Sequence, residues 1–259
     1  MSATTAAIVL AGGRSERMGR EKATLQWHGS TLLRRAVGIV ARCVEGPVVV
    51  VRAAGQDLPP LPPGVEIATD EREARGPLQG IAAGLHALAG RAEIVFVTGV
   101  DAPLLHPALV AHVIASLQAD DDVALPQAHG FPHPLAAAYR AVTIAPLIAE
   151  QLEHDRLGTR PLFERCRVHR LDAAALLADP AVAALDPDLR SLDNLNEPGE
   201  YAAAHALPEP LVSVEGRGPV RAATLARAEC GPATINGRPA TDPHEPLAAG
   251  DVVRPTDGR

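Results

Sequence analysis

The sequence predicts an α/β fold, in which helices flank a mostly parallel β-sheet, with a small β-rich module at the C-terminus. Short segments that are almost entirely apolar, such as 6–10, 47–51 and 93–97, alternate with segments whose apolar residues recur at helical spacing. Strands that are apolar on both faces are typical of a parallel sheet covered by helices on both sides. With 259 residues, the chain can form one large domain with a sizeable core and a small appendage.

Strands and helices are expected in alternation along the first 200 residues. The expected strands cover 6–10, 47–51, 65–67, 93–97, 123–125 and 135–139. The expected helices cover 31–43, 76–88, 106–117, 141–152 and the Ala/Leu-rich region 171–185. Ser30 is a plausible N-cap for the first helix, and Pro77 suits the first turn of the second.

The C-terminal segment changes character after His205. Residues 207–210 (LPEP) are typical of a linker and divide a main domain, 1–206, from a module of about fifty residues, 207–259. Within the module the pattern predicts a strand over 211–214, a short helix over 220–228 and a strand with a turn over 233–237. A core this small is near the lower limit for independent folding, so we expect the module to pack on the main domain or on a partner.

Composition and charge exclude several classes of protein. A net charge of −7 and an aromatic content of 2% argue against nucleic-acid binding, which needs clustered positive charge or stacking platforms. Three widely spaced cysteines, Cys43, Cys166 and Cys230, fit a reducing compartment better than a disulfide scaffold. The sequence has no apolar run of membrane-spanning length and no basic region typical of a signal peptide at its N-terminus, so we expect a cytoplasmic protein without a membrane span.

A glycine-rich, cationic loop directly follows the first predicted strand. It includes Leu10, Ala11, Gly12, Gly13, Arg14, Ser15, Arg17, Gly19 and Lys22. Ligands of open α/β sheets bind at the carboxyl ends of strands, where this loop lies. Glycines let backbone N–H groups approach phosphates closely, and the cations can neutralise a triphosphate or a leaving pyrophosphate. The spacing matches neither the Walker loop nor the dinucleotide fingerprint. A solvated surface turn is the alternative interpretation.

Polar residues also follow the third apolar strand and precede a later helix. Asp101, in the segment VTGVDAP, can hold Mg²⁺ against nucleotide phosphates, or it can simply cap the following turn. Asn194 and Asn196, in DNLNEP, lie on one face of an extended segment. Either could add an amide oxygen to a metal or substrate, although Asn196 could also be an ordinary N-cap.

Weaker candidates lie at neighbouring strand ends. Asp70 follows the short strand 65–67 and could accept hydrogen bonds from a base or sugar. The helix start at Gly76, Pro77 and Leu78 offers free N–H groups to an anion or base. His133, which precedes a strand, is more readily explained as a structural residue than as a catalytic one.

Five motifs together resemble the molybdenum cofactor nucleotidyltransferases of the MobA-like NTP transferase family. LAGGRSERMGREK, GPLQGIAAGL, VDAP, HPLAAAY and DNLNEP occur in that family's order, over residues 4 to 206. The resemblance implies a Rossmann-like nucleotidyltransferase fold and transfer of a nucleoside monophosphate from GTP or CTP to the phosphate of molybdopterin, with release of pyrophosphate. LAGG at 10–13 resembles the guanylyl branch and implies Mg²⁺ and GTP.

The resemblance also implies roles for residues of this chain. Arg17, Lys22 and Asp101 would be catalytic, and Asp101 and Asn196 would hold the metal. The nucleotide would be bound by Leu10, Ala11, Gly12, Gly13, Arg14, Ser15, Lys22, Asp70, Gly76, Pro77, Leu78 and Asp101. A cytidylyltransferase, a transferase acting on another small phosphorylated acceptor, and a nucleotide-binding delivery protein without chemistry are the alternatives.

The module at 207–259 lies outside the usual extent of that family. Its segments ING at 235–237 and PLAAGDVV at 246–253 are similar to the closing half of sulfur-carrier β-grasp proteins. The chain ends in Asp-Gly-Arg rather than Gly-Gly, which argues against a working sulfur carrier. We expect a small β-grasp-like binding module, with an irregular extension as the alternative. In the interpretation without chemistry, the module would dock a molybdoenzyme or a cofactor-delivery chaperone.

Overall fold

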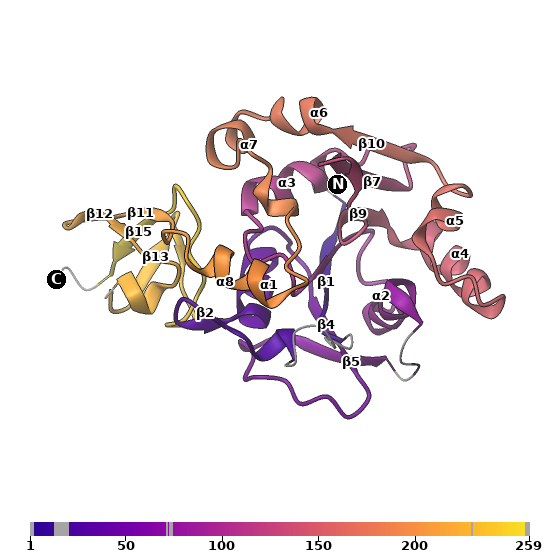
Figure 1. Ribbon diagram of the computed structural model, residues 1–259, viewed down its shortest axis with the longest axis horizontal. Helices are drawn as coiled ribbons and strands as arrows, with labels where there is room; N and C mark the ends of the chain where they lie inside the picture. Colours follow the sequence, from indigo (N-terminus) through magenta and orange to yellow (C-terminus); the bar gives the residue numbers. More distant parts are fainter. Residues whose placement is uncertain (1–2, 13–20, 71, 73–74, 229, 257–259) are drawn as a thin grey trace.

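The computed structural model describes residues 3–12, 21–70, 72, 75–228 and 230–256. At its centre lies a sheet with strand order β10-β7-β9-β6-β1-β4-β5, to which the short β8 is added beside β7 (Figure 1). The bounds of these strands are β1 Thr5–Leu10, β4 Val48–Ala53, β5 Glu66–Asp70, β6 Ile94–Gly99, β7 Val123–Ala128, β8 Phe131–Pro132, β9 Ala136–Arg140 and β10 Val168–Asp172.

The sheet is mostly parallel, as predicted. β1 pairs in parallel with both β4 and β6, β4 with β5, and β10 with β7. β9 is antiparallel to its two neighbours, β6 and β7, and β8 is antiparallel to β7. The carboxyl ends of β1, β4, β5 and β6 therefore share one edge of the sheet, where the sequence predicts the site.

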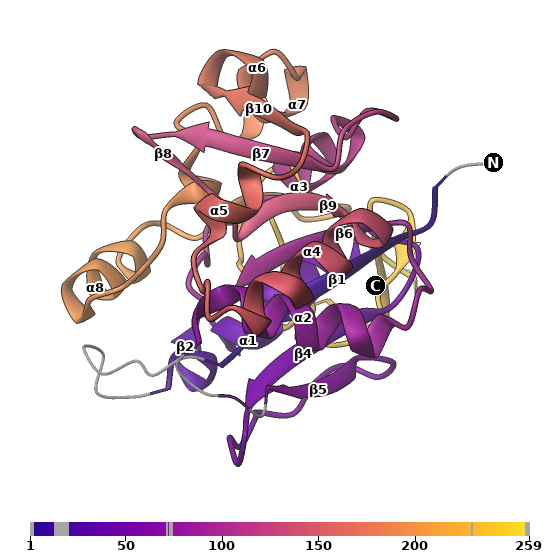
Figure 2. The ribbon, with the colours of Figure 1, turned by 90° about the vertical axis from the view of Figure 1, so that its right-hand side faces the viewer.

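Helices cover both faces of this sheet, as Figures 1 and 2 show. On one face lie α1 Leu32–Ala41, α3 Pro107–Ala115, α6 Ala173–Leu177 and α7 Pro180–Leu185, and on the other lie α2 Gly76–Leu88, α4 Ala141–Glu153 and α5 Thr159–Phe163. Successive residues of β1 alternate between the two cores, with Ala7 and Val9 in one and Ala6 and Ile8 in the other. This alternation explains why the strand is apolar throughout.

The helix expected over 171–185 is wrong in part. Its first residues belong to β10, which pairs with β7, and two short helices follow. The Asp172 carboxylate accepts a hydrogen bond from the Ala175 N–H at the start of α6. The Asp179 carboxylate likewise caps α7, which begins at Pro180. Two capping aspartates thus divide a segment whose composition alone favours one helix.

The N-cap of α1 is Thr31 rather than Ser30. The Thr31 hydroxyl accepts a hydrogen bond from the Arg34 N–H at 3.2 Å. Ser30 instead belongs to a small hairpin formed by β2, Gln26–Trp27, and β3, Ser30–Thr31. Because the helix begins after Thr31, Ser30 and Thr31 can pair with Trp27 and Gln26 in the hairpin. The turn that makes this pairing possible is not visible in the helical pattern of the sequence.

The C-terminal module has its own sheet, in the order β12-β11-β15-β13-β14. Its strands are β11 Leu211–Val214, β12 Gly218–Arg221, β13 Ala233–Ile235, β14 Arg238–Pro239 and β15 Val252–Pro255. The expected helix over 220–228 is wrong in part, because Arg221 pairs with Leu211 in the sheet and only 225–228 form a 3-10 turn. The first and last strands of the module lie side by side in parallel. The β-grasp resemblance stays a prediction.

The module packs beside α1 and α8, Pro198–His205, at the left of Figure 1. Ion pairs join α1 to the module, with Arg34 bound to Asp242 and Arg42 bound to Asp251. The module also has a hydrophobic cluster of its own. This cluster supports a division into domains 1–206 and 207–259, which we retain as a proposal, and Ala248 of the module packs into the core of the main domain.

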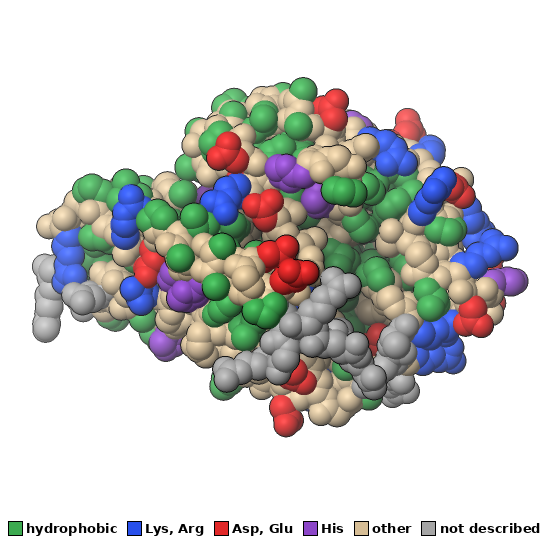
Figure 3. Space-filling model, in the orientation of Figure 1, with side chains coloured by type: hydrophobic (Ala, Val, Ile, Leu, Met, Phe, Trp, Pro, Cys, Tyr) green, Lys and Arg blue, Asp and Glu red, His purple; other side chains and the backbone are tan. Residues whose placement is uncertain are grey.

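Basic side chains do not form a continuous face in the view of Figure 3. They gather at the right, where α4 and α5 lie, and acidic side chains lie among them. Arg165 pairs there with Glu150, and Arg160 with Glu164. Cys43, Cys166 and Cys230 are free thiols. Within the described ranges, no helix combines the length and the apolar character needed to cross a bilayer.

Candidate active site

The end of β1 is held in place by its neighbour β4. The N–H groups of Ala11 and Gly12 both donate to the carbonyl of Val51, at 2.8 and 3.2 Å. The Gln56 amide donates to the Ala11 carbonyl at 3.1 Å and accepts from the Ala53 N–H. Gln56 was not expected from the sequence, because a single glutamine in a loop carries no pattern. Five predicted residues of the loop, Gly13, Arg14, Ser15, Arg17 and Gly19, lie outside the described residues.

Lys22 lies at the centre of the candidate site. Its ammonium Nζ donates to the Asn196 amide oxygen at 3.1 Å and contacts the Asp101 carboxylate at 3.5 Å. The Lys22 and Asp101 side chains are only 15% and 22% exposed, so solvent screens this pair less than a surface pair. Three residues separated by 79 and 174 positions in the chain thus converge on one point.

The sheet explains the position of Asp101. β6 ends at Gly99, which pairs with Leu10 at the end of β1, and the chain then turns. The Asp101 carboxylate folds back over Gly99, where an added Cβ would lie 2.5 Å from its Oδ1. The Asp101 carbonyl accepts a hydrogen bond from the Leu195 N–H at 2.8 Å. This contact aligns the segment that carries Asn196 with the end of β6.

Asn196 is not the N-cap of α8. Glu197 occupies that position, and the Glu200 carboxylate accepts hydrogen bonds from the N–H groups of Asn196 and Glu197. These two hydrogen bonds lower the pKa of Glu200. The side chain of Asn196 is therefore not used for capping, and its oxygen faces Lys22.

Asp70 and the start of α2 lie at the same edge of the sheet. Asp70 ends β5, and its carboxylate accepts a hydrogen bond from the Arg72 N–H at 3.0 Å. α2 begins at Gly76, as predicted, with a φ of +70° that favours glycine, and Pro77 follows in its first turn. No side chain caps this helix start. The backbone N–H groups of Gly76 and Leu78 can therefore donate to an anionic or polar ligand.

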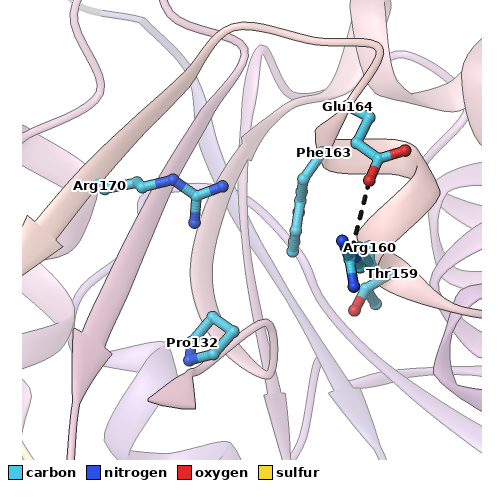
Figure 4. A pocket seen from close by; sticks show the side chains of 6 residues that line it. All are labelled: Pro132, Thr159, Arg160, Phe163, Glu164 and Arg170. Atoms are coloured by element: carbon cyan, nitrogen blue, oxygen red, sulfur yellow. Dashed lines mark hydrogen bonds and ion pairs between the residues drawn. The ribbon is translucent and has the colours of Figure 1, made fainter. Parts of the chain in front are cut away.

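Two cavities share Pro132 in their linings, and the smaller of them adjoins the site. The smaller, of about 140 Å³, lies beside Asp101 and is lined by Pro77, Ala102, Pro132, His133, Pro134, Leu135, Ala136, Ser191, Leu192 and Asn194. The larger, of about 370 Å³, lies between β10 and α5, and Pro132 lines both. Figure 4 shows Arg170 and Phe163 pointing into the larger cavity, with the Arg160–Glu164 ion pair at its side. The two cavities are thus neighbours, and Lys22 lines neither of them.

His133 has a structural contact. Its Nε2 lies 3.1 Å from the Ala128 carbonyl, and burial lowers the pKa of the ring. The neighbouring Tyr139 is fully buried, and its hydroxyl donates to the Pro134 carbonyl at 2.8 Å. His133 therefore forms part of the wall of the smaller cavity, in agreement with its structural interpretation, and Tyr139 holds Pro134, which lines the same cavity.

The donor chemistry of this site fits a divalent cation. One carboxylate and one amide oxygen, from Asp101 and Asn196, already converge on the cationic ammonium of Lys22. Mg²⁺ is commonly held by one or two protein oxygens together with phosphates and water. The described residues contain no cluster of three or more His, Cys, Asp or Glu suited to a metal, so a dedicated all-protein cage is not found among them. A metal shared with a phosphorylated ligand needs no such cage.

Comparisons with known proteins agree with this geometry. Residues 7–171 match the family model of the MobA-like NTP transferase domain. A probable molybdenum cofactor guanylyltransferase of Mycobacterium ulcerans is 44% identical over 139 residues, which cover 52% of this chain and 67% of the relative. The protein of the same name from Mycobacterium tuberculosis is 44% identical over 140 residues, with the same coverage of 52% and 67%.

Solved structures share the fold. Molybdopterin-guanine dinucleotide biosynthesis protein A from Archaeoglobus fulgidus has a TM-score of 0.59 at 21% identity, covering 77% of this chain and 96% of that protein. The 2-C-methyl-D-erythritol 4-phosphate cytidylyltransferase of Thermus thermophilus has a TM-score of 0.53 at 18% identity, covering 77% and 96%. Since the family model spans more than half of the chain, this chain belongs to the MobA-like NTP transferase family and is a nucleotidyltransferase.

Proposed function

We propose that the chain transfers GMP from GTP to the phosphate of molybdopterin and releases pyrophosphate, with Mg²⁺ as the metal. The observation that carries this proposal is the convergence of Lys22, Asp101 and Asn196 at the carboxyl ends of β1 and β6. The names of the 44%-identical relatives support guanylyl transfer and the molybdenum cofactor as acceptor. The LAGG sequence at 10–13 supports the same choice of nucleotide.

The reaction is a phosphoryl substitution. A phosphate oxygen of the acceptor attacks the α-phosphorus of GTP, a new P–O bond forms, and the bond from that phosphorus to the β-phosphate oxygen breaks. Pyrophosphate leaves with the electron pair of the broken bond. A phosphate monoester is largely ionised near neutral pH, so the attacking oxygen needs no general base. Mg²⁺ held by Asp101 and Asn196 would neutralise phosphate charge.

Lys22 would neutralise the charge that develops on the departing pyrophosphate. An ammonium has three donors. Among the described residues, Lys22 directs them at two acceptors, Asn196 and Asp101. One donor is therefore left for a phosphate oxygen. Arg17, which lies outside the described residues, is proposed to add charge on the same side.

The remaining edge of the sheet would bind the rest of the nucleotide. β1 ends at Leu10, and Ala11 and Gly12 follow it. We propose that these three residues and the glycine loop contact the base and phosphates. Asp70 would bind the nucleoside. At the start of α2, Gly76 and Leu78 would donate backbone N–H groups to it, and Pro77, which has no N–H, would contact it through its ring.

The acceptor would approach from the opposite side. The smaller cavity adjoins Asp101 through Ala102 and is lined by Asn194, and the larger cavity continues it past Pro132. An acceptor longer than its phosphate can lie along this path, with the phosphate next to Asp101. The guanidinium of Arg170 would then face the far end of the acceptor.

A turnover panel tests this proposal. Purified protein with Mg²⁺ and molybdopterin is given GTP, CTP, ATP or UTP separately, and released pyrophosphate is measured. We expect GTP to be used at least tenfold better than CTP, because a base-reading site typically discriminates by more than about 1.4 kcal/mol. Preference for CTP would replace the guanylyl assignment. Nucleotide binding without pyrophosphate release would favour a delivery protein.

A further inference from the structure

A single buried arginine joins the C-terminal module to the loop that carries Asp101. Arg35 lies on α1 and is 7% exposed. Its Nε donates to the carbonyl of Pro103, two residues after Asp101. Its Nη1 donates to the carbonyl of Leu247, in the module, at 3.4 Å. One rigid, planar guanidinium therefore contacts the loop with one edge and the module with another.

The module segment that contacts Arg35 is itself firmly fixed. We call residues 245–251 the strap. Arg42 of α1 donates to the Pro246 carbonyl at 3.1 Å and binds the Asp251 carboxylate with two nitrogens. Gly38, one turn from Arg35 on α1, leaves room for the ring of Pro246, with which an added Cβ would collide. The strap therefore has little freedom to move away from Arg35.

A second connection runs from the strap to the same loop through His106. The His106 Nδ1 accepts from the Ala108 N–H, so its Nε2 carries the proton and donates to the Ala249 carbonyl at 3.0 Å. The His106 N–H donates to the Ser191 hydroxyl at 2.9 Å, and that hydroxyl reaches the Leu104 carbonyl at 3.5 Å. The strap is thus linked to the middle of the loop through Arg35 and contacts the end of the loop directly at His106.

The burial of Arg35 makes these contacts consequential. Burial, and next the nearby Arg42, lowers the pKa of Arg35 to about 10, so the group stays charged at neutral pH. A buried charge is strongly destabilising unless polar groups surround it. The carbonyls of Pro103 and Leu247 are the acceptors found for it among the described residues. Loss of either acceptor would therefore leave the buried guanidinium short of a partner and weaken the link between the strap and the loop.

We propose that Arg35 is a positioning residue, through which the strap of the C-terminal module holds the Asp101 loop in its reactive geometry. This inference rests on the proposed function for its effect on turnover. The module lies outside residues 7–171, the segment that matches the family model. This chain would therefore support its Asp101 loop with a C-terminal module that the family model does not include. A misplacement of about 1 Å at a reacting centre can lower the rate on the order of 100-fold.

A matched pair of variants tests the proposal in the full-length protein. Arg35→Met removes the link, whereas Arg34→Met removes only the neighbouring contact of α1 with Asp242 of the same module. We expect Arg35→Met to lower kcat about 10- to 100-fold with the KM for GTP changed by less than about threefold. Arg34→Met should leave kcat within about twofold. Arg35→Lys keeps one cationic donor and should restore part of the rate.

Amide hydrogen exchange provides a readout that needs no turnover. The Leu195 N–H donates to the Asp101 carbonyl, and the Leu105 N–H donates to the Ala102 carbonyl. Both amides should exchange about tenfold faster in Arg35→Met than in Arg34→Met, since the loop opens more often. If Arg35→Met does not fold, Gly38→Ala, which displaces Pro246, should produce the same faster exchange.

The outcomes separate two kinds of failure. A wild-type protein that releases no pyrophosphate from GTP refutes the proposed function, and the exchange comparison then still decides the positioning role. A folded Arg35→Met protein with wild-type kcat and wild-type exchange overturns the positioning role alone. Equal losses in Arg34→Met and Arg35→Met would also overturn it, because they would trace the effect to the stability of the module.

Discussion

Substituting Gly99 with alanine should displace the catalytic carboxylate while leaving the fold intact. The new Cβ would lie 2.5 Å from Oδ1 of Asp101, whereas ordinary contacts begin at 3.4 Å. The carboxylate must therefore move by about 0.9 Å, the difference between these distances. A displacement of this size predicts a loss of kcat on the order of 100-fold, or about 2.7 kcal/mol in activation free energy.

Steady-state pyrophosphate release measures this loss, and Gly199→Ala is the control. An added Cβ at Gly199 meets nothing within 4 Å, so its kcat should stay at the wild-type value. Gly99 does not have a positive φ, so alanine adds no backbone strain there. Urea denaturation should give similar unfolding midpoints for the two variants. Wild-type kcat in a folded Gly99→Ala protein would refute the role assigned to the position of Asp101.

Three further predictions concern the pH dependence, the core and Lys22. Burial lowers the pKa of three histidines below 6.5: His28, His106 and His133. As the pH falls through 6.5, these histidines bind protons in the unfolded chain but stay neutral in the fold. Their contribution to the free energy of unfolding is therefore complete above pH 6.5 and decreases below it. Equal urea midpoints at about pH 7.5 and 5.5 would contradict this prediction. Gly84→Val should destabilise the fold by about 1–3 kcal/mol in urea titrations, because an added Cβ would lie 2.7 Å from the Ile8 side chain, and an unchanged midpoint would disprove the close packing of α2 on β1. Asn196→Ala removes the acceptor that lies 3.1 Å from the Lys22 ammonium and should lower kcat/KM for GTP about tenfold. Steady-state kinetics measure this change, and a kcat/KM equal to that of the wild type would contradict the prediction.

The convergence of Lys22 with Asp101 was predictable because of a general property of parallel sheets. β1 and β6 are neighbours, so their carboxyl ends and the polar residues after them lie together. Continuous apolar strands reveal such a sheet in the sequence, and the glycine loop and the Asp101 segment each follow one of them. The position of Asn196 could not be predicted from the sheet alone, since it depends on the backbone hydrogen bond from Leu195 to Asp101.

The role of Arg35 could not be predicted from the sequence. An arginine in an amphipathic helix resembles an exposed charge, and its neighbour Arg34 has the same appearance. The acceptors of Arg35 lie 68 and 212 residues away, so only the packing of the module on α1 identifies it. The N-cap at Thr31 and the strand at 168–172 were missed for a similar reason, because each depends on pairing with a distant or adjoining strand.

Pyrophosphate release by Asp101→Ala tests the central claim most directly. In the proposed mechanism, the Asp101 carboxylate opposite Lys22 holds the divalent cation against the phosphates of GTP. We expect the variant to keep the wild-type fold by circular dichroism and to release no measurable pyrophosphate from GTP with Mg²⁺ and acceptor. Full turnover by the folded variant would contradict the proposed metal site and the mechanism built on it.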